Sequence, residues 1–290
     1  MIQYYKVAEH IFGIDAAEKY LAQLTNYAPF MLDEIAPTHV FIIHVHEAPL
    51  PSTDEWQHLY TDRSDEDMPR IEMYKRAGEW MFMTSMWRET EIVSAMQCSA
   101  DWREVNVYMK TENARFAIDN AAMLVYAFAT AGLQTLLFHS SVTVLDGKGY
   151  MFLGHSGTGK STHSRQWKEA FPACELLNDD NPAVRIWPDG TVRVYGSPWS
   201  GKTPCYKNDS APVQALVQLA QAPENKITRL KMSQAYPYIL ASVSGLKVMP
   251  EMMDRIFESI AKLLEISPVY RLECLPNPDA ARLCAQTCSL

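Results

Sequence analysis

The sequence predicts an α/β fold with mixed sheets, in which a smaller N-terminal α+β domain precedes a domain built around a phosphate-binding loop. Three observations predict this class. An apolar run at 150–153 leads into the pattern G-x-x-x-x-G-K-[ST] at 154–161, and a stretch without Pro or Gly follows. Strand-like runs joined by short turns flank that pattern, which does not suit an all-parallel sheet. Near residue 113 the chain changes from short mixed elements to one long apolar helix.

The N-terminal part, 1–112, is expected to be the smaller α+β domain, and its role is not indicated by its residues. The 290-residue chain is long enough for two ordinary domains. His44 and His46 would share one strand face, with His39 nearby, but two histidines are a weak signal for a metal site. The strands expected here are 40–45, 80–83 and 105–108.

The second part, 113–290, is expected to be the nucleotide-binding domain. Its first element is an apolar helix at 114–131, in which Arg115 and Asp119 argue against a membrane span. The Asp-Gly pair at 146–147 favours a hairpin between the runs on either side. The further strands expected are 135–138, 142–145, 150–153, 174–180, 184–187, 191–195 and 213–220, and the further helices are 162–170, 233–244, 249–265 and 278–287.

The pattern at 154–161 is typical of a phosphate loop. Its glycines let the backbone turn tightly enough to direct consecutive N–H groups at phosphate oxygens, and the following helix adds its positive dipole end. Lys160 is placed to reach the phosphates and Ser161 to reach magnesium. The expected ligands are therefore ATP and Mg²⁺. The residues expected to bind the nucleotide are Gly154, Ser156, Gly157, Thr158, Gly159, Lys160, Ser161 and Thr162.

A second stretch, 196–203, satisfies the same pattern but is not expected to hold phosphate. Pro198 lies inside it and Pro204 follows it directly. Proline removes a backbone donor and disfavours the helical conformation in the residue before it, so no helix N-terminus is expected there. Candidate cations for the γ-phosphate or the acceptor are Lys202, Lys207 and Arg229.

Two adjacent carboxylates, Asp179 and Asp180, end an apolar run after the loop helix. Phosphoryl transfer needs a carboxylate that holds magnesium directly or through water, and a kinase benefits from one that accepts the hydroxyl proton. We favour Asp179 as the base and Asp180, with Ser161, as the metal side, and the reverse stays open. His139 follows a strand-like run and would orient or tune one carboxylate from a neighbouring strand. With Lys160, these three form the expected catalytic set.

His139, the loop at 154–161 and the Asp179-Asp180 pair resemble, in that order, the C-terminal catalytic domain of HPr kinase/phosphorylase. ATP-dependent phosphoenolpyruvate carboxykinase, which has the same fold, shares the order of loop and Asp pair. The resemblance covers 114–200 well and 201–290 loosely. It implies that Lys160 handles phosphates and that one aspartate is the base with His139 as its partner. The residues after the Asp pair depart from the HPr kinase pattern, so HPr itself is not implied as the acceptor.

The expected function is ATP- and Mg²⁺-dependent transfer of the γ-phosphoryl group to a hydroxyl, that of serine in a protein or peptide or that of a small molecule. Two alternatives stay open. One is carboxykinase-type transfer to an enolate. The other is a non-catalytic nucleotide-binding regulator or assembly module that acts through residues 1–112.

Composition limits the partners. The net charge of −8 and the lack of a basic stripe argue against a nucleic-acid partner. The first residues lack the basic-then-apolar layout of a signal peptide, so we expect a cytoplasmic protein without a membrane partner. Self-association into a homo-oligomer is left open. The six cysteines have no paired metal spacing and are expected to be free thiols.

Overall fold

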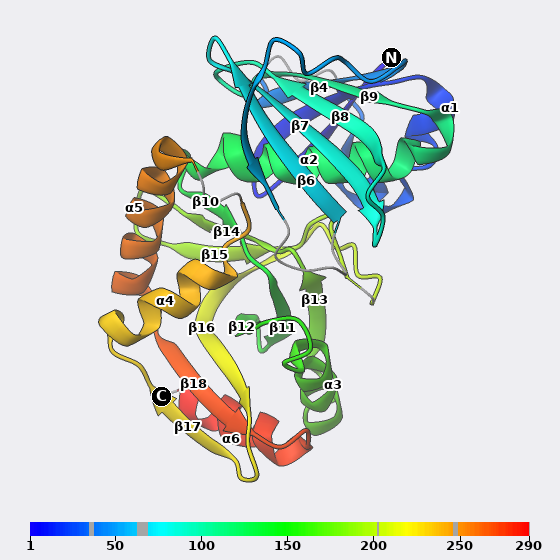
Figure 1. Cartoon of the computed structure of the whole chain (residues 1–290). Coiled ribbons are helices and arrows are strands. Elements are labelled where there is room, and N and C mark those ends of the chain that lie inside the picture. The colour runs from blue at the N-terminus through cyan, green and yellow to red at the C-terminus, as the bar shows by residue number, and fades with distance from the viewer. Residues whose placement is uncertain (35–37, 63–68, 202, 246–248, 290) are drawn as a thin grey trace. The chain divides into compact units, whose positions relative to one another are not determined.

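The computed structural model describes residues 1–34, 38–62, 69–201, 203–245 and 249–289 (Figure 1). It divides into two compact units, Met1–Ala129 and Thr130–Leu290. The division falls near the end of the long helix α2 (Ala114–Ala131), whereas the sequence suggested a boundary before that helix. The mixed α/β class is confirmed, because each unit contains a large sheet with both parallel and antiparallel pairs.

The first unit is built on a sheet of nine strands among the described residues. They are β1 (Ile2–Val7), β2 (His10–Asp15), β3 (Met31–Leu32), β4 (Phe41–Glu47), β5 (Gln57–Thr61), β6 (Pro69–Arg76), β7 (Glu79–Trp87), β8 (Ile92–Cys98) and β9 (Glu104–Met109). Their order is β3-β1-β2-β4-β9-β8-β7-β6-β5. Central β4 pairs in parallel with β2 and β9, and the other neighbours are antiparallel. Short helical turns are α1 (Glu18–Leu21), η1 (Thr25–Phe30) and η2 (Thr111–Asn113).

Helix α2 is rich in apolar residues because it packs on the first sheet. Figure 1 shows the helix beside that sheet. The ring of Phe128 lies 4.7 Å from that of Trp102 and 5.8 Å from that of Phe82. The Tyr126 hydroxyl donates a hydrogen bond to the carbonyl of Val7 at 2.9 Å. The expected helix at 114–131 is thus confirmed as a core helix. None of the described helices is long and apolar enough to cross a membrane.

The second unit also contains a sheet of nine strands among the described residues. They are β10 (Thr135–Leu137), β11 (Ser140–Leu145), β12 (Lys148–Leu153), β13 (Glu175–Asp180), β14 (Ala183–Ile186), β15 (Val192–Tyr195), β16 (Ser210–Gln221), β17 (Lys226–Arg229) and β18 (Val269–Cys274). The main order is β10-β14-β15-β16-β12-β11-β13, and β18 joins β16 with β17 outside it. Strands β12 and β18 both run parallel to β16, so three parallel strands end at one edge.

The turn between β11 and β12 sets the register of the strands that carry the candidate site. Leu145 pairs with Lys148, leaving Asp146 and Gly147 as a two-residue loop with φ of 51° and 72°. Positive φ at both positions is the signature of the type I′ hairpin turn, which Asp-Gly favours. The expected hairpin is therefore confirmed. Strand β11 pairs on its other side with β13, also antiparallel.

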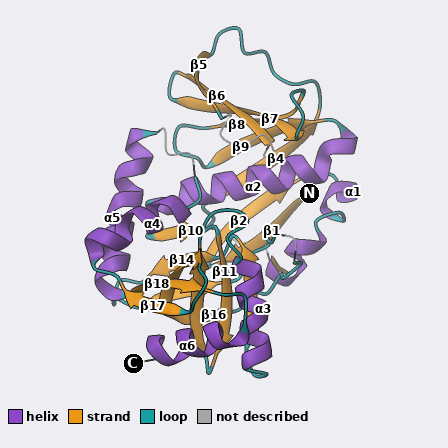
Figure 2. Cartoon of the chain, turned by 60° about the horizontal axis from the view of Figure 1, so that its bottom comes forward, coloured by secondary structure: helices purple, strands orange, loops and turns teal. Residues whose placement is uncertain are grey.

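Within the described residues, four helices accompany the second sheet. They are α3 (Lys160–Ala170), α4 (Met232–Ser242), α5 (Pro250–Ile266) and α6 (Pro278–Cys288). Helices α3 and α6 lie side by side (Figure 2) and share a core in which the fully buried Trp167 meets Phe152 of β12 and Cys284 of α6. Helices α4 and α5 contact each other, and α5 contacts β10 and β14. The six cysteines are free thiols, as expected.

Trp167→Ala should lower the free energy of unfolding by about 3–5 kcal/mol, because it empties a fully buried ring site. It also removes the indole N–H that donates to His163 Nε2 at 3.0 Å. Chemical denaturation of the full chain, followed by circular dichroism, measures the change. Phe257→Ala on the exposed side of α5 is the control and should cost less than about 1 kcal/mol. Equal effects of the two changes would contradict the described core.

Candidate functional site

The expected phosphate loop connects the buried end of β12 to the first residue of α3. Gly157 and Gly159 have φ of 79° and 106°, a region that L side chains rarely adopt. Gly159 is the N-cap of α3, and having no side chain it makes no capping hydrogen bond. The first N–H groups of a helix have no partner within the helix. The loop therefore presents an uncapped positive helix end, the arrangement that binds anions.

Lys160 lies across the loop that precedes it. Its Nζ atom donates to the carbonyl oxygens of Gly154 at 2.9 Å and His155 at 3.3 Å. The side chain is buried, and burial lowers its pKa, while the nearby charges of Asp180 and Asp179 act in the opposite direction. The structure thus brings the expected phosphate-binding lysine into the electrostatic field of both expected carboxylates.

The Asp pair stands at the end of β13, where pairing with β11 places Ser140 opposite Asp180. His139 directly precedes Ser140, and its Nε2 atom lies 3.4 Å from Asp180 Oδ1. Burial raises the pKa of Asp180 to about 6. The charge of Asp179 also raises this pKa, whereas the charge of Lys160 lowers it. Burial and the charges of Lys160 and His155 lower the pKa of His139 to about 4. At neutral pH a neutral imidazole therefore faces an ionised carboxylate.

A buried polar network that the sequence analysis missed holds the Asp pair. The amide of Asn178 donates to Ser197 Oγ at 3.2 Å, and its Oδ1 accepts from the Asp180 N–H at 3.0 Å. Asn181 donates to Asp180 Oδ2 at 2.9 Å, and Ser244 donates to Asn181 Oδ1 at 3.0 Å. The signal in the sequence was the run Asn-Asp-Asp-Asn, in which two amides enclose the acids. These residues position the carboxylates.

The second G-x-x-x-x-G stretch lies against the Asp pair and serves close backbone packing. The Gly201 N–H donates to the carbonyl of Asp179 at 3.0 Å, and Ser200 forms an isolated antiparallel β-bridge with Asp180. A Cβ at Gly201 would stand 2.8 Å from that carbonyl oxygen, and one at Gly196 would stand 1.9 Å from the Lys207 oxygen. Residues 203–209 form no helix. The stretch is therefore no phosphate cradle, and Lys202 lies outside the described residues.

The other two candidate cations are separated. Lys207 Nζ pairs with Glu175 Oε2 at 2.9 Å and borders a cavity that also reaches Asp179 and Ser161. Arg229 ends β17 and lines a different cavity of about 190 Å³, together with parts of α4 and α5. The structure therefore brings Lys207, and not Arg229, to a cavity at the Asp pair.

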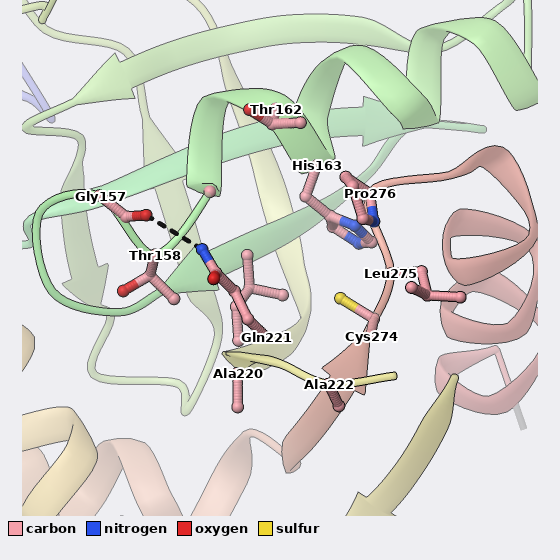
Figure 3. Close-up of a pocket in the computed structure, with 12 residues that line it drawn as sticks. Gly157, Thr158, Thr162, His163, Ala220, Gln221, Ala222, Cys274, Leu275 and Pro276 are labelled. Atoms are coloured by element: carbon pink, nitrogen blue, oxygen red, sulfur yellow. Dashed lines mark hydrogen bonds between the residues drawn. The ribbon is translucent and has the colours of Figure 1, made fainter. Parts of the chain in front are cut away.

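Two larger cavities border the loop. One, of about 570 Å³, lies between Gly157–Gly159, the end of β16 and the end of β18 (Figure 3). Gln221 donates to the Gly157 carbonyl at 3.3 Å across its rim. This cavity lies at the carboxyl ends of parallel strands, a common ligand position in open α/β sheets. The second, of about 470 Å³, is lined by Ser161, Asp179 and residues of α3.

The oxygen donors at the site suit magnesium in part. Among the described residues, no group of three or more His, Cys, Asp and Glu side chains could hold a metal ion. Magnesium at phosphoryl-transfer sites is commonly held by one or two carboxylates together with substrate phosphates, so a larger cluster is not required. Asp179, Asp180 and the Ser161 hydroxyl are donors of that kind.

Comparison with known proteins places the chain in a family. Residues 102–276, more than half of the chain, match the family model described as SynChlorMet cassette protein ScmC. The chain belongs to the ScmC family. The matched residues of this ScmC protein include His139, the loop and the Asp pair.

Other comparisons add little to this. No curated protein matches the ScmC chain. Among solved structures, the HPr(Ser) kinase/phosphatase from Coxiella burnetii aligns at 11% identity over 52% of this chain and 86% of that chain. The TM-score of that alignment is 0.31.

Asp180→Asn should stabilise the protein at pH 8 and lose that advantage near pH 4. Because the pKa of Asp180 is raised to about 6, the folded state holds an unfavourable charge above that pH. Below the unfolded pKa the carboxyl is protonated in both states, so the difference vanishes. The side chain is 34% exposed, and solvent screening reduces the expected gain to about 1 kcal/mol.

Chemical denaturation at a series of pH values measures this effect. Asp189→Asn is the matched control, because a backbone hydrogen bond from Thr191 lowers the pKa of Asp189, so removing that charge should not stabilise. A gain for Asp180→Asn that is as large at pH 4 as at pH 8 would contradict the described environment.

Proposed function

We propose that this ScmC protein is an ATP- and Mg²⁺-dependent kinase that transfers the γ-phosphoryl group to a hydroxyl. One observation carries the proposal. Lys160, at the uncapped start of α3, lies within the electrostatic field of Asp179 and Asp180, and His139 stands 3.4 Å from Asp180. A lysine at a helix start, two carboxylates and an imidazole are therefore close together, which supports the proposal because phosphoryl transfer needs groups of these kinds.

Phosphates would be held by the loop. The first N–H groups of α3 and the Lys160 ammonium supply donors and positive charge where the β- and γ-phosphates would lie. The cavity of about 570 Å³ beside Gly157 has the size of ordinary ligand pockets and would take the nucleoside. Its apolar lining by Leu219, Leu275 and Pro276 suits the faces of a flat base.

Magnesium would be held on the side of Asp180 and the Ser161 hydroxyl. Bound there, the ion would supply positive charge against the negative charge that develops during transfer. Asp180 offers a carboxylate whose ionisation falls below about pH 6, so metal binding should weaken in acid. Asn181 donates a hydrogen bond to Asp180 Oδ2, and His139 Nε2 lies 3.4 Å from Oδ1.

Asp179 would accept the proton of the attacking hydroxyl. It is buried, and it lines the cavity of about 470 Å³ together with Ser161, on the loop side where an acceptor could approach. In the transfer, the acceptor oxygen bonds to the γ-phosphorus as the bond to the β-γ bridging oxygen breaks, and the proton passes to the carboxylate. The raised pKa of Asp180 favours the alternative in which Asp180 is the base and Asp179 is on the metal side.

Lys160→Ala should weaken Mg·ATP binding at least tenfold, about 1.4 kcal/mol, because the ammonium would contact the phosphates directly. Isothermal titration calorimetry on the full chain measures the affinity. Lys226→Ala on exposed β17 is the control and should bind normally. Unchanged affinity in Lys160→Ala would contradict the loop assignment.

Asp179→Asn and Asp180→Asn should each reduce transfer from γ-labelled ATP by at least about 10²-fold, through different steps. Asp179→Asn should bind Mg·ATP nearly normally and fail at transfer, having lost the proton acceptor. Asp180→Asn should raise the magnesium concentration needed for half-maximal binding. His139→Ala should resemble Asp180→Asn in milder form, because His139 lies beside Asp180 and not beside the proposed base.

These variants also separate the open alternatives. Wild-type turnover in both aspartate variants at saturating magnesium would refute the catalytic assignment. ATP binding without transfer to any hydroxyl would instead favour a nucleotide-binding regulator. Reversed phenotypes would exchange the roles of the two aspartates and leave the kinase proposal intact.

A further inference from the structure

The cavity of about 470 Å³ beside the Asp pair has a strongly basic side. Three cationic side chains line it, Arg165 and Lys168 from α3 and Lys207 from the segment after the second glycine stretch. Lys207 is paired with Glu175 at 2.9 Å. Arg165 and Lys168 instead donate to neutral oxygens, Thr162 Oγ1 at 3.2 Å and the Pro172 carbonyl at 2.7 Å.

The two helical cations are exposed and keep their charge available. Neither forms an ion pair in the part of the chain that the structure describes. The field of Lys168 and Lys207 extends over the cavity, since Lys168 acts on Cys174 and Lys207 acts on Cys205, both of which line it. Glu175 and Asp179 also line the cavity, so its three cations outnumber its two carboxylates, and an anion entering from solvent would meet a net positive charge.

Helix α3 arranges these groups in a line. Ser161, Arg165 and Lys168 are spaced i, i+4 and i+7, which places them on one helix face. At a rise of about 1.5 Å per residue, the backbone positions of Arg165 and Lys168 lie roughly 6 and 10 Å along the helix from Ser161. The reacting end of the cavity, at Ser161 and Asp179, is thus separated from its cationic end by a defined length.

We propose that this cavity binds the phosphoryl acceptor, and that the acceptor carries an anionic group roughly 6–10 Å from its reacting hydroxyl. The inference rests on the proposed kinase function and specifies its substrate class. The hydroxyl would face Asp179, and a carboxylate or phosphate of the acceptor would face Arg165 and Lys168. The floor, formed by Thr143, Cys174 and Cys205, would contact the linking atoms.

The test compares acceptors that differ in one charge. One pair of probes is acetyl-Ser-Ala-Glu-amide and acetyl-Ser-Ala-Gln-amide, and the other is 6-hydroxyhexanoate and 6-hydroxyhexanamide. Transfer from γ-labelled ATP and calorimetric binding with a non-hydrolysable ATP analogue are measured for each. We expect the anionic member of at least one pair to be favoured at least tenfold, and the favoured pair shows whether a peptide or a small molecule is the source.

Variants locate the preference. Arg165→Ala combined with Lys168→Ala should remove it while Mg·ATP binding is retained, which also shows that the protein is folded. Lys262→Ala, an exposed lysine paired with Glu258 on α5, should leave it intact. Equal use or binding of the charged and neutral probes, failure to bind any probe, or a preference that survives the double change would overturn the proposal. If the wild-type protein does not bind Mg·ATP, the kinase function itself is refuted.

Discussion

The antiparallel pairing of β11 with both β12 and β13 is the constraint on which the candidate site depends. Strand β12 leads into the glycine-rich loop at 154–161, β13 ends in the Asp pair, and β11 between them begins directly after His139. A shift of one residue in either pairing would turn every side chain of a strand to the other face. The two-residue turn at Asp146-Gly147 fixes one of these registers.

Local patterns predicted much of the second unit because local chemistry determines it. The hairpin at Asp146-Gly147 and the loop before α3 follow from turn residues and glycine placement, and helix α2 of the first unit follows in the same way from its periodicity. Strand β18 was missed, although its residues alternate apolar and polar from Tyr270 to Cys274, because a period of two over so short a run is weak without a partner. Its place beside β16 is a long-range pairing that no local pattern states.

The contacts that support the candidate site were less accessible to sequence reasoning. The proximity of His139 to the Asp pair could be anticipated, because His139 follows a strand-like run that is expected to neighbour the strand of the Asp pair. The hydrogen bonds of Asn178 and Ser197 could not, since they join β13 to a loop nearly twenty residues later in the chain. The division into units near the end of α2 was also out of reach, because it depends on which sheet the helix packs against.

The folded-back position of Lys160 bears on how tightly an anion can be held. The ammonium is removed from bulk water during folding and is already solvated by two backbone carbonyls. An arriving phosphate therefore exchanges one set of hydrogen bonds for a stronger, charge-assisted set and does not have to strip a hydrated ammonium. Under the proposed function, much of the desolvation penalty would be met before the ligand arrives, so the loop would favour anions over neutral molecules, which cannot replace the carbonyls on equal terms.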